Sequence, residues 1–212
     1  MHKFILIIII IFLPIGAFGI ENSQEQTPDL TKIRVFSQIS GAISEVQTIA
    51  SEFTQEKHSS IFEDILISKG MFYYENPDRL RWELTAPRVY GFSVNGDMAK
   101  RWKGKKLYEQ DFDLNSDPMM KVFIDMLFYI TSADFDELDK SYIITVLEEK
   151  PAVLKLIPSS KGWKKYLGHL MLFFSIGDSP LHTVEIHEPD GDFTRIRFEN
   201  TIINQPIQPD MF

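Results

Sequence analysis

The sequence predicts a mainly β (α+β) protein: a strongly curved antiparallel half-barrel of about ten strands, covered by two to three helices. Two observations carry this prediction. Many short segments alternate between apolar and polar residues, which is the pattern of half-buried antiparallel strands. Turn sequences rich in Asn, Asp, Gly and Pro separate these segments, whereas apolar spacing of the helical kind occurs in only two or three places.

The first 19 residues have the form of a secretory signal peptide. Lys3 gives a positive start, an apolar run follows, and Ala17-Phe18-Gly19 fits the small-x-small cleavage pattern. The run ends at Pro14 after about ten residues, which is short of the ~20 that a membrane-spanning helix needs. We expect cleavage near Gly19 and export to the periplasm, because the chain has no cysteine and therefore no disulfide.

Composition limits what the exported chain can do. Residues 20–28 are polar and are expected to be a disordered leader, which leaves one domain over residues 29–212. The formal net charge of −8 argues against nucleic acid and against stable docking on anionic lipid. The 17 Phe, 7 Tyr, 3 Trp and 8 Met are a large apolar load, and methionine-rich clusters also suit adaptable apolar binding surfaces.

The first half of the domain reads as one helix followed by hairpins. Residues 29–47 have apolar spacing of three to four and predict an amphipathic helix. Alternation then predicts a strand at 48–58 and a second strand that runs to Tyr74. Asn76-Pro77-Asp78 supplies a turn, and the return strand places residues 80, 82 and 84 on one face. A further hairpin pairs 90–95 with 98–103, and a strand follows at 107–110.

The second half reads as helices followed by a meander. Residues 118–130 have helical spacing but are apolar nearly all round, so this helix must be covered on both sides. It is either a buried core helix or one wall of a cavity for a greasy ligand. A short helix is predicted at 132–140, capped by Ser132. Strands follow at 142–148, 152–157, 169–176, 181–188 and 193–199, before a proline-rich tail.

No catalytic or metal-binding constellation is visible, so we expect no enzymatic activity, no cofactor and no metal. The nucleophile-elbow, zinc-protease and phosphate-loop motifs are all absent. His187 and Glu185 share a strand face, but His182 lies on the opposite one, so the three do not form a ligand set. The basic segment with Lys161 and Lys165 is expected to be a solvated loop, with docking of an acidic partner as the alternative.

Several local patterns occur together in the order of a known family. They are Phe53-Thr54-Gln55, Gly70-x-Phe72-x-Tyr74, Asn76-Pro77-Asp78-x-Leu80-x-Trp82, Ser93-Val94-Asn95-Gly96, Leu154-x-Leu156-x-Pro158 and Gly191-Asp192-x-Thr194-x-Ile196-x-Phe198. With the signal peptide, these patterns make the chain similar to the LolA family of periplasmic outer-membrane lipoprotein carriers.

The resemblance implies an incomplete β-barrel closed by a helical lid, acting as a monomer. Its apolar interior would shelter the acyl chains of a lipoprotein between an inner-membrane transporter and an outer-membrane acceptor. Two departures are visible: the family has an arginine that helps to hold the lid where this chain has Asn76, and the family continues beyond the position of Phe212. A different acylated lipid or glycolipid as cargo, or an envelope-stress sensor of the same fold, is the alternative.

Strand alternation and the family motif together nominate the site. The inward residues expected to line a lipid cavity are Phe53, Leu80, Trp82, Phe92, Val94, Leu154, Leu172, Phe174, Ile186 and Phe198. The residues expected on the lid are Met119, Phe123, Met126 and Leu127. Each of them would serve equally well as ordinary core.

Overall fold

The computed structural model describes residues 29–61, 64–104, 110–114, 118–175 and 181–212. The predicted signal peptide and leader lie outside these ranges, as does most of the predicted strand at 107–110. Within the described ranges, no helix is long and apolar enough to span a membrane.

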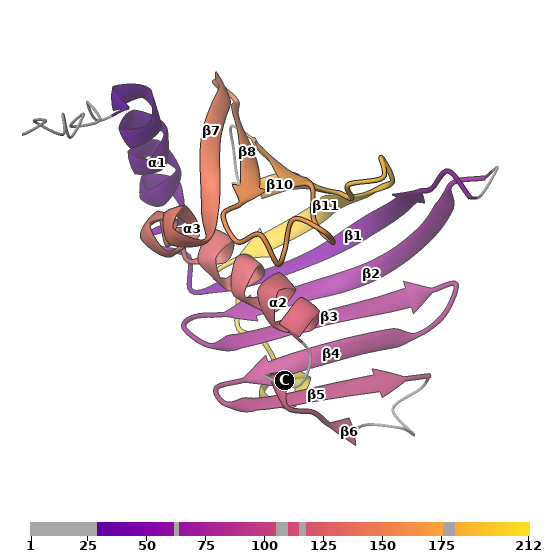
Figure 1. Ribbon diagram of the computed structural model, residues 1–212. Helices are drawn as coiled ribbons and strands as arrows, with labels where there is room; N and C mark the ends of the chain where they lie inside the picture. The colour runs from indigo at the N-terminus through magenta and orange to yellow at the C-terminus, as the bar shows by residue number, and fades with distance from the viewer. Residues whose placement is uncertain (1–28, 62–63, 105–109, 115–117, 176–180) are drawn as a thin grey trace, which may run out of the picture.

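All the strands in these described ranges form one antiparallel sheet, in which the pairing of β1 with β11 joins two meanders. The strand order is β6-β5-β4-β3-β2-β1-β11-β10-β9-β8-β7, so the sheet ends in β6 and β7 and is not closed. Figure 1 shows its strong curvature, which confirms the half-barrel with eleven strands in place of about ten. The strands are β1 (Thr48–His58), β2 (Leu66–Glu75), β3 (Arg79–Ala86), β4 (Tyr90–Asn95), β5 (Met98–Lys103), β6 (Gln110–Asp111), β7 (Tyr142–Glu149), β8 (Ala152–Pro158), β9 (His169–Phe174), β10 (Leu181–His187) and β11 (Phe193–Ile203).

Helix α2 (Pro118–Thr131) lies across the concave face of the sheet, while α1 (Leu30–Ile43) and α3 (Phe135–Ser141) pack beside β7 (Figure 1). Phe36 of α1 stacks on Phe135 of α3 with ring centroids 4.2 Å apart. Ion pairs from Lys32 to Asp139 and from α1 to Glu149 of β7 reinforce this corner. Only α2 is therefore placed to act as a cover for the concave face.

Two helix boundaries differ from the sequence prediction for local reasons. Helix α1 stops at Ile43 and not near Gln47, because the Gln47 carbonyl accepts a hydrogen bond from the Asn76 amide (2.8 Å) and the chain has already joined the sheet. Helix α3 is capped by Asp134, whose carboxylate accepts from the Glu137 amide at 3.1 Å. Ser132 is not the cap, since its hydroxyl instead donates back to the end of α2.

The convex face carries the C-terminal tail. Arg81 of β3 points outward, where its Nη1 donates to the Met211 carbonyl at 2.9 Å and its guanidinium stacks on Trp102. Trp102 in turn lies over Gly91, where an added Cβ would meet the indole at 2.4 Å. The two sheet faces are thus built differently: the convex one by charge and stacking, the concave one by apolar packing.

Candidate functional site

The concave face is apolar because every strand alternates in phase with its neighbours. Cross-strand pairs place apolar residues of neighbouring strands side by side on this face: Phe53 opposes Phe198, and Trp82 opposes Phe92. In this register all ten nominated cavity residues lie on the concave face. Nine of them are buried, and Ile186 is partly exposed. Their placement follows the predicted alternation, while contact with a cargo stays a prediction.

Five aromatic rings form the centre of this face. The ring of Trp82 stacks on Phe53 at 4.0 Å between centroids and meets Phe72, Phe198 and Phe123 edge-on at 5.9, 6.2 and 5.6 Å. Four of these rings come from the sheet and Phe123 comes from α2. We call these five residues the aromatic cluster; it joins the helix to both meanders of the sheet.

Gly70 is a site residue whose structural role the sequence reasoning missed. It lies opposite Phe53 on β2, and a Cβ there would approach the Phe53 ring to 2.2 Å and the Glu83 carbonyl oxygen to 2.3 Å. The Phe53 ring therefore needs a glycine beneath it to reach Trp82. The only sequence signal was that Gly70 opens the Gly-x-Phe-x-Tyr pattern.

Helix α2 packs on the concave face through more of its surface than the nominated stripe. Of the nominated residues, Met126 and Leu127 are buried and Phe123 is partly buried. Ile124 and Ile130, which were not nominated, are buried as well. Met119 lies in the first turn, and its side chain falls outside the described part of the structure. The helix is covered nearly all round, as its composition predicts.

An open groove of about 480 Å³ runs between α2 and the β8–β9 side of the sheet. That volume lies within the ~300–1,000 Å³ typical of small-molecule sites. Its walls are mostly apolar and its rim is charged. The lining residues are Val122, Phe123, Met126, Tyr142, Trp163, Lys165, Tyr166, Leu167, Leu170, Ile186, Glu188, Pro189 and Asp190.

Two smaller spaces adjoin the same helix. A more polar extension of about 280 Å³ shares Val122 and Met126 with the groove. A small apolar cavity of about 30 Å³ lies near the end of α2, where Phe72 and Phe198 line it. The aromatic cluster therefore borders the groove through Phe123 and the small apolar cavity through Phe72 and Phe198.

Of the nominated residues, only a few touch these spaces. Phe123, Met126 and Ile186 line the groove, and Phe198 lines the small apolar cavity. Trp82 lines none of these spaces, because it is 5% exposed inside the aromatic cluster. Sequence reasoning missed the wall supplied by the β8–β9 connection, since the fold of a loop leaves no periodic signal.

The walls of the groove carry no charge in their deeper part. Burial raises the pKa of Tyr142 to about 12, so its phenol stays neutral at physiological pH. Lys165, Glu188 and Asp190 are charged but stand at the rim. Such a site suits an apolar chain that carries a polar group at one end.

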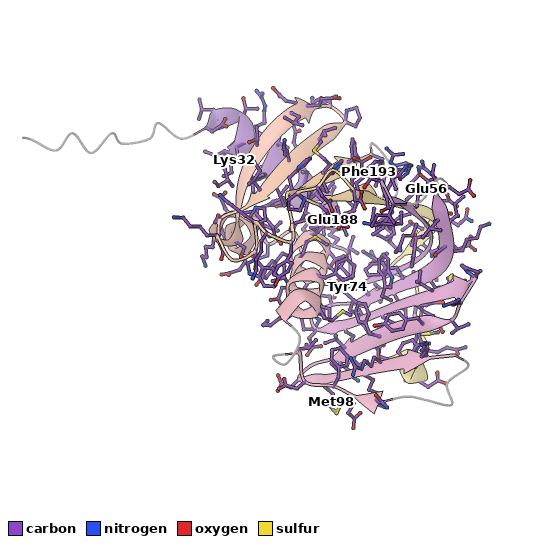
Figure 2. The ribbon with its side chains drawn as sticks, turned by 45° about the vertical axis from the view of Figure 1, so that its right-hand side comes forward. Lys32, Glu56, Tyr74, Met98, Glu188 and Phe193 are labelled. Carbon is purple, nitrogen blue, oxygen red and sulfur yellow. The ribbon has the colours of Figure 1, made fainter. Side chains whose placement is uncertain are left out.

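The turn at Asn76 connects to α2 through Tyr74. The Tyr74 hydroxyl donates to Asn76 Oδ1 at 3.3 Å, and its ring meets Phe128 of α2 edge-on at 6.2 Å. Burial raises the pKa of Tyr74, and a side-chain hydrogen bond with Thr131 at the end of α2 partly opposes that rise. Figure 2 shows Tyr74 on the sheet beside this helix. The Tyr74 side chain thus links this turn to α2.

No group of three or more His, Cys, Asp or Glu side chains in the described ranges is arranged to hold a metal ion. His187 donates or accepts at 2.9 Å with Glu185, which Arg195 also contacts at 2.7 Å. These groups lie on the convex face, on the other side of the sheet from the groove. The groove itself has mostly apolar walls, with Lys165, Glu188 and Asp190 at its rim.

A half-open antiparallel barrel with an apolar concave face, a helix laid across it and a groove beside that helix defines a class of apolar-ligand-binding proteins. The chain belongs to the LolA family: the family model described as "Outer membrane lipoprotein carrier protein LolA" matches residues 44–212. The match begins directly after α1 and takes in all the described strands together with α2 and α3.

Individual relatives are distant. An outer-membrane lipoprotein carrier protein of Methylococcus capsulatus is 22% identical over 205 residues, which cover 96% of this chain and 90% of the relative. A crystal structure of a DUF1329 family protein from Desulfovibrio piger shares the fold, with a TM-score of 0.50, 12% identity, and 82% and 92% of the two chains covered. A crystal structure of MucB is 12% identical with a TM-score of 0.49, and this chain spans 60% of its length.

Proposed function

We propose that this protein is a periplasmic carrier that shelters the acyl chains of lipoproteins and moves them from the inner to the outer membrane. The observation that carries the proposal is the open apolar groove beside α2. Membership of a family described as lipoprotein carriers supports the choice of cargo. An inner-membrane transporter would load the protein and an outer-membrane acceptor would unload it.

The energetics of acyl binding fit this groove. Each methylene removed from water contributes about 0.8 kcal/mol, and no specific hydrogen bond is required for the chain itself. The rim charges Lys165 and Asp190 stay in contact with water and with the polar end of the cargo. Phe123 and Met126 of α2 line the groove, so movement of these side chains would change the room that it offers to an acyl chain.

Native mass spectrometry of the protein purified gently from its own periplasm tests the proposal. An adduct with the mass of an acylated protein is the expected result. A smaller lipid adduct would indicate that the cargo is a glycolipid or phospholipid and not a lipoprotein. The absence of any adduct, together with no uptake of a fluorescent fatty acid, would refute the carrier function.

A second candidate function is an interaction module of the same fold. Two observations favour it: the tight packing of Trp82 among four rings, and the exposed apolar residues Ile65, just before β2, and Ile67 on β2. Such a module would bind a protein partner without taking up lipid. The uptake of a fluorescent fatty acid by the purified protein separates the two functions.

A further inference from the structure

Three connections meet at one end of the half-barrel. His58 at the end of β1 pairs with Phe193, which also pairs with His187 at the end of β10, and His187 pairs with His169 at the start of β9. The β1–β2, β8–β9 and β10–β11 connections therefore lie together. Figure 2 shows Glu188 and Phe193 well apart from Met98, which lies at the opposite end. We call this the loop end of the molecule.

Direct contacts hold these connections in place. Lys57 of β1 forms an ion pair with Glu188, and the Ser60 amide donates to the Asp192 carboxylate at 2.8 Å. The Gly168 amide donates to the His187 carbonyl, also at 2.8 Å. The loop end is thus one connected surface, and two of its carboxylates already have partners.

The β1–β2 hairpin carries unusual apolar exposure at this end. Its strands run past their neighbours, because the last β3 pair is Ala86 with Lys69 and β11 begins opposite His58 (Figure 1). Beyond Lys69, β2 still pairs with β1, but β3 no longer pairs with it on the other side. The exposed fractions are 83% for Ile61, 49% for Ile65, 47% for Leu66 and 56% for Ile67, four residues that we call the hairpin tip.

The β8–β9 loop supplies positive charge and aromatic rings at the same end of the sheet. Lys161, Lys164 and Lys165 are exposed, and none of them forms an ion pair with a carboxylate in the described part of the chain. Tyr166 is 50% exposed, and its ring lies 6.5 Å from that of Trp163. Three lysines within five residues stand out in a chain whose net charge is −8.

This combination matches the chemistry of a lipid surface. Trp and Tyr concentrate where hydrocarbon meets water, and lysines near an anionic leaflet contribute about 1 kcal/mol each. Exposed Ile and Leu gain free energy when they enter the acyl boundary. The groove also reaches this end, since Trp163 and Tyr166 line one side of it and Pro189 lines the other.

We propose that the loop end docks reversibly on an anionic lipid bilayer, with the hairpin tip inserted and the loop lysines against the headgroups. The acidic net charge of the whole chain resists tight adsorption, so the local lysines orient the molecule and do not anchor it permanently. The groove would then open toward the membrane surface. The inference concerns the surface of the protein and does not depend on what the groove binds.

Vesicle flotation with the mature protein tests the proposal. We expect binding to phosphatidylcholine vesicles that contain phosphatidylglycerol, no binding to phosphatidylcholine alone, and release at high salt because salt screens exposed charges. Lys161→Glu with Lys164→Glu should weaken the binding by about 30-fold or more, from about fivefold for each lysine. Ile65→Glu with Ile67→Glu should also abolish it.

Two variants at the opposite end serve as matched controls. Met98→Glu changes a side chain that is 65% exposed in the β4–β5 hairpin, and Lys150→Glu changes an exposed lysine between β7 and β8. Both should float like the wild type. Equal loss in these controls, or full binding by either loop-end variant, would overturn the proposal. Binding only to membranes that contain protein would identify a protein receptor and also overturn it.

The same variants separate this proposal from the carrier function. Ile65 and Ile67 do not line the groove, so their replacement should leave the uptake of a fluorescent fatty acid in vesicle-free solution unchanged. Loss of flotation with normal uptake supports membrane docking. Normal flotation without uptake would leave docking in place and count against the carrier.

Discussion

A bulky substitution at Val122 tests the groove without touching the core. Val122 is partly exposed on α2 and lines both the 480 Å³ groove and its 280 Å³ extension. Val122→Trp adds an indole where the structure has open space. Since the residue is outside the aromatic cluster, we expect the folded protein to keep its thermal stability.

The size of the effect follows from the methylenes that the indole displaces. If the ring excludes about four methylenes of an acyl chain, at about 0.8 kcal/mol each, binding weakens by about 3 kcal/mol. This corresponds to about 200-fold in the dissociation constant. Val122→Ala is the matched control, because it widens the groove at the same position and should bind at least as well as the wild type.

Titration with a fluorescent fatty acid measures the constant, and circular dichroism verifies that each variant is folded. A folded Val122→Trp protein that binds the probe as tightly as the wild type would refute the assignment of the groove as the acyl site. Binding lost equally in Val122→Ala would show that α2 responds to any change at this position, and would refute it as well.

Three further predictions concern stability. Gly70→Ala should lower the free energy of unfolding by about 1–3 kcal/mol, because the new Cβ overlaps the Phe53 ring, whereas Gly41→Ala in α1, with nothing within 4 Å, should raise it by about 0.5–1 kcal/mol. A hydrogen bond from Arg197 holds the pKa of Glu56 below its usual range, so Glu56 stabilises the fold at neutral pH and this contribution is lost as the pH falls below about 4.5. Glu56→Gln should therefore show a smaller loss of stability between neutral and acidic pH. Tyr74→Phe should cost about 0.5–1.5 kcal/mol through the lost hydroxyl contacts with the turn and α2.

Chemical and thermal unfolding decide each of them. A stable Gly70→Ala protein would mean that Phe53 can leave its place over β2. An unchanged acid response in Glu56→Gln would assign the pH dependence to other carboxylates. A Tyr74→Phe protein of wild-type stability would remove the tyrosine from the contacts that hold α2.

Much of the site was predictable because its cause is local. Side chains of a strand alternate between two faces, and one face of this sheet is buried, so the pattern of Leu80 and Trp82 already told which side turns inward. The same reasoning placed Phe53, Phe198 and Ile186 on the concave face. The apolar circumference of α2 likewise indicated a helix covered on both sides.

The rest depends on contacts between distant segments. Periodicity cannot tell a packed ring from one that lines a groove, and Trp82 turned out to be packed while Val122 and Leu167 form groove wall. Nor could it show that Gly70 makes room for Phe53, since that requires the register of β1 against β2.

The sequence by itself thus determined the fold class, the inward face of the strands that carry the nominated cavity residues, and the family. Only the tertiary structure decided where α2 leaves space, and that the β8–β9 loop borders the groove and shares one end of the molecule with the exposed β1–β2 hairpin. The physical reason is one of range. Alternation and turn chemistry act between neighbouring residues, whereas a groove is the volume left over when elements far apart in the chain pack against one another.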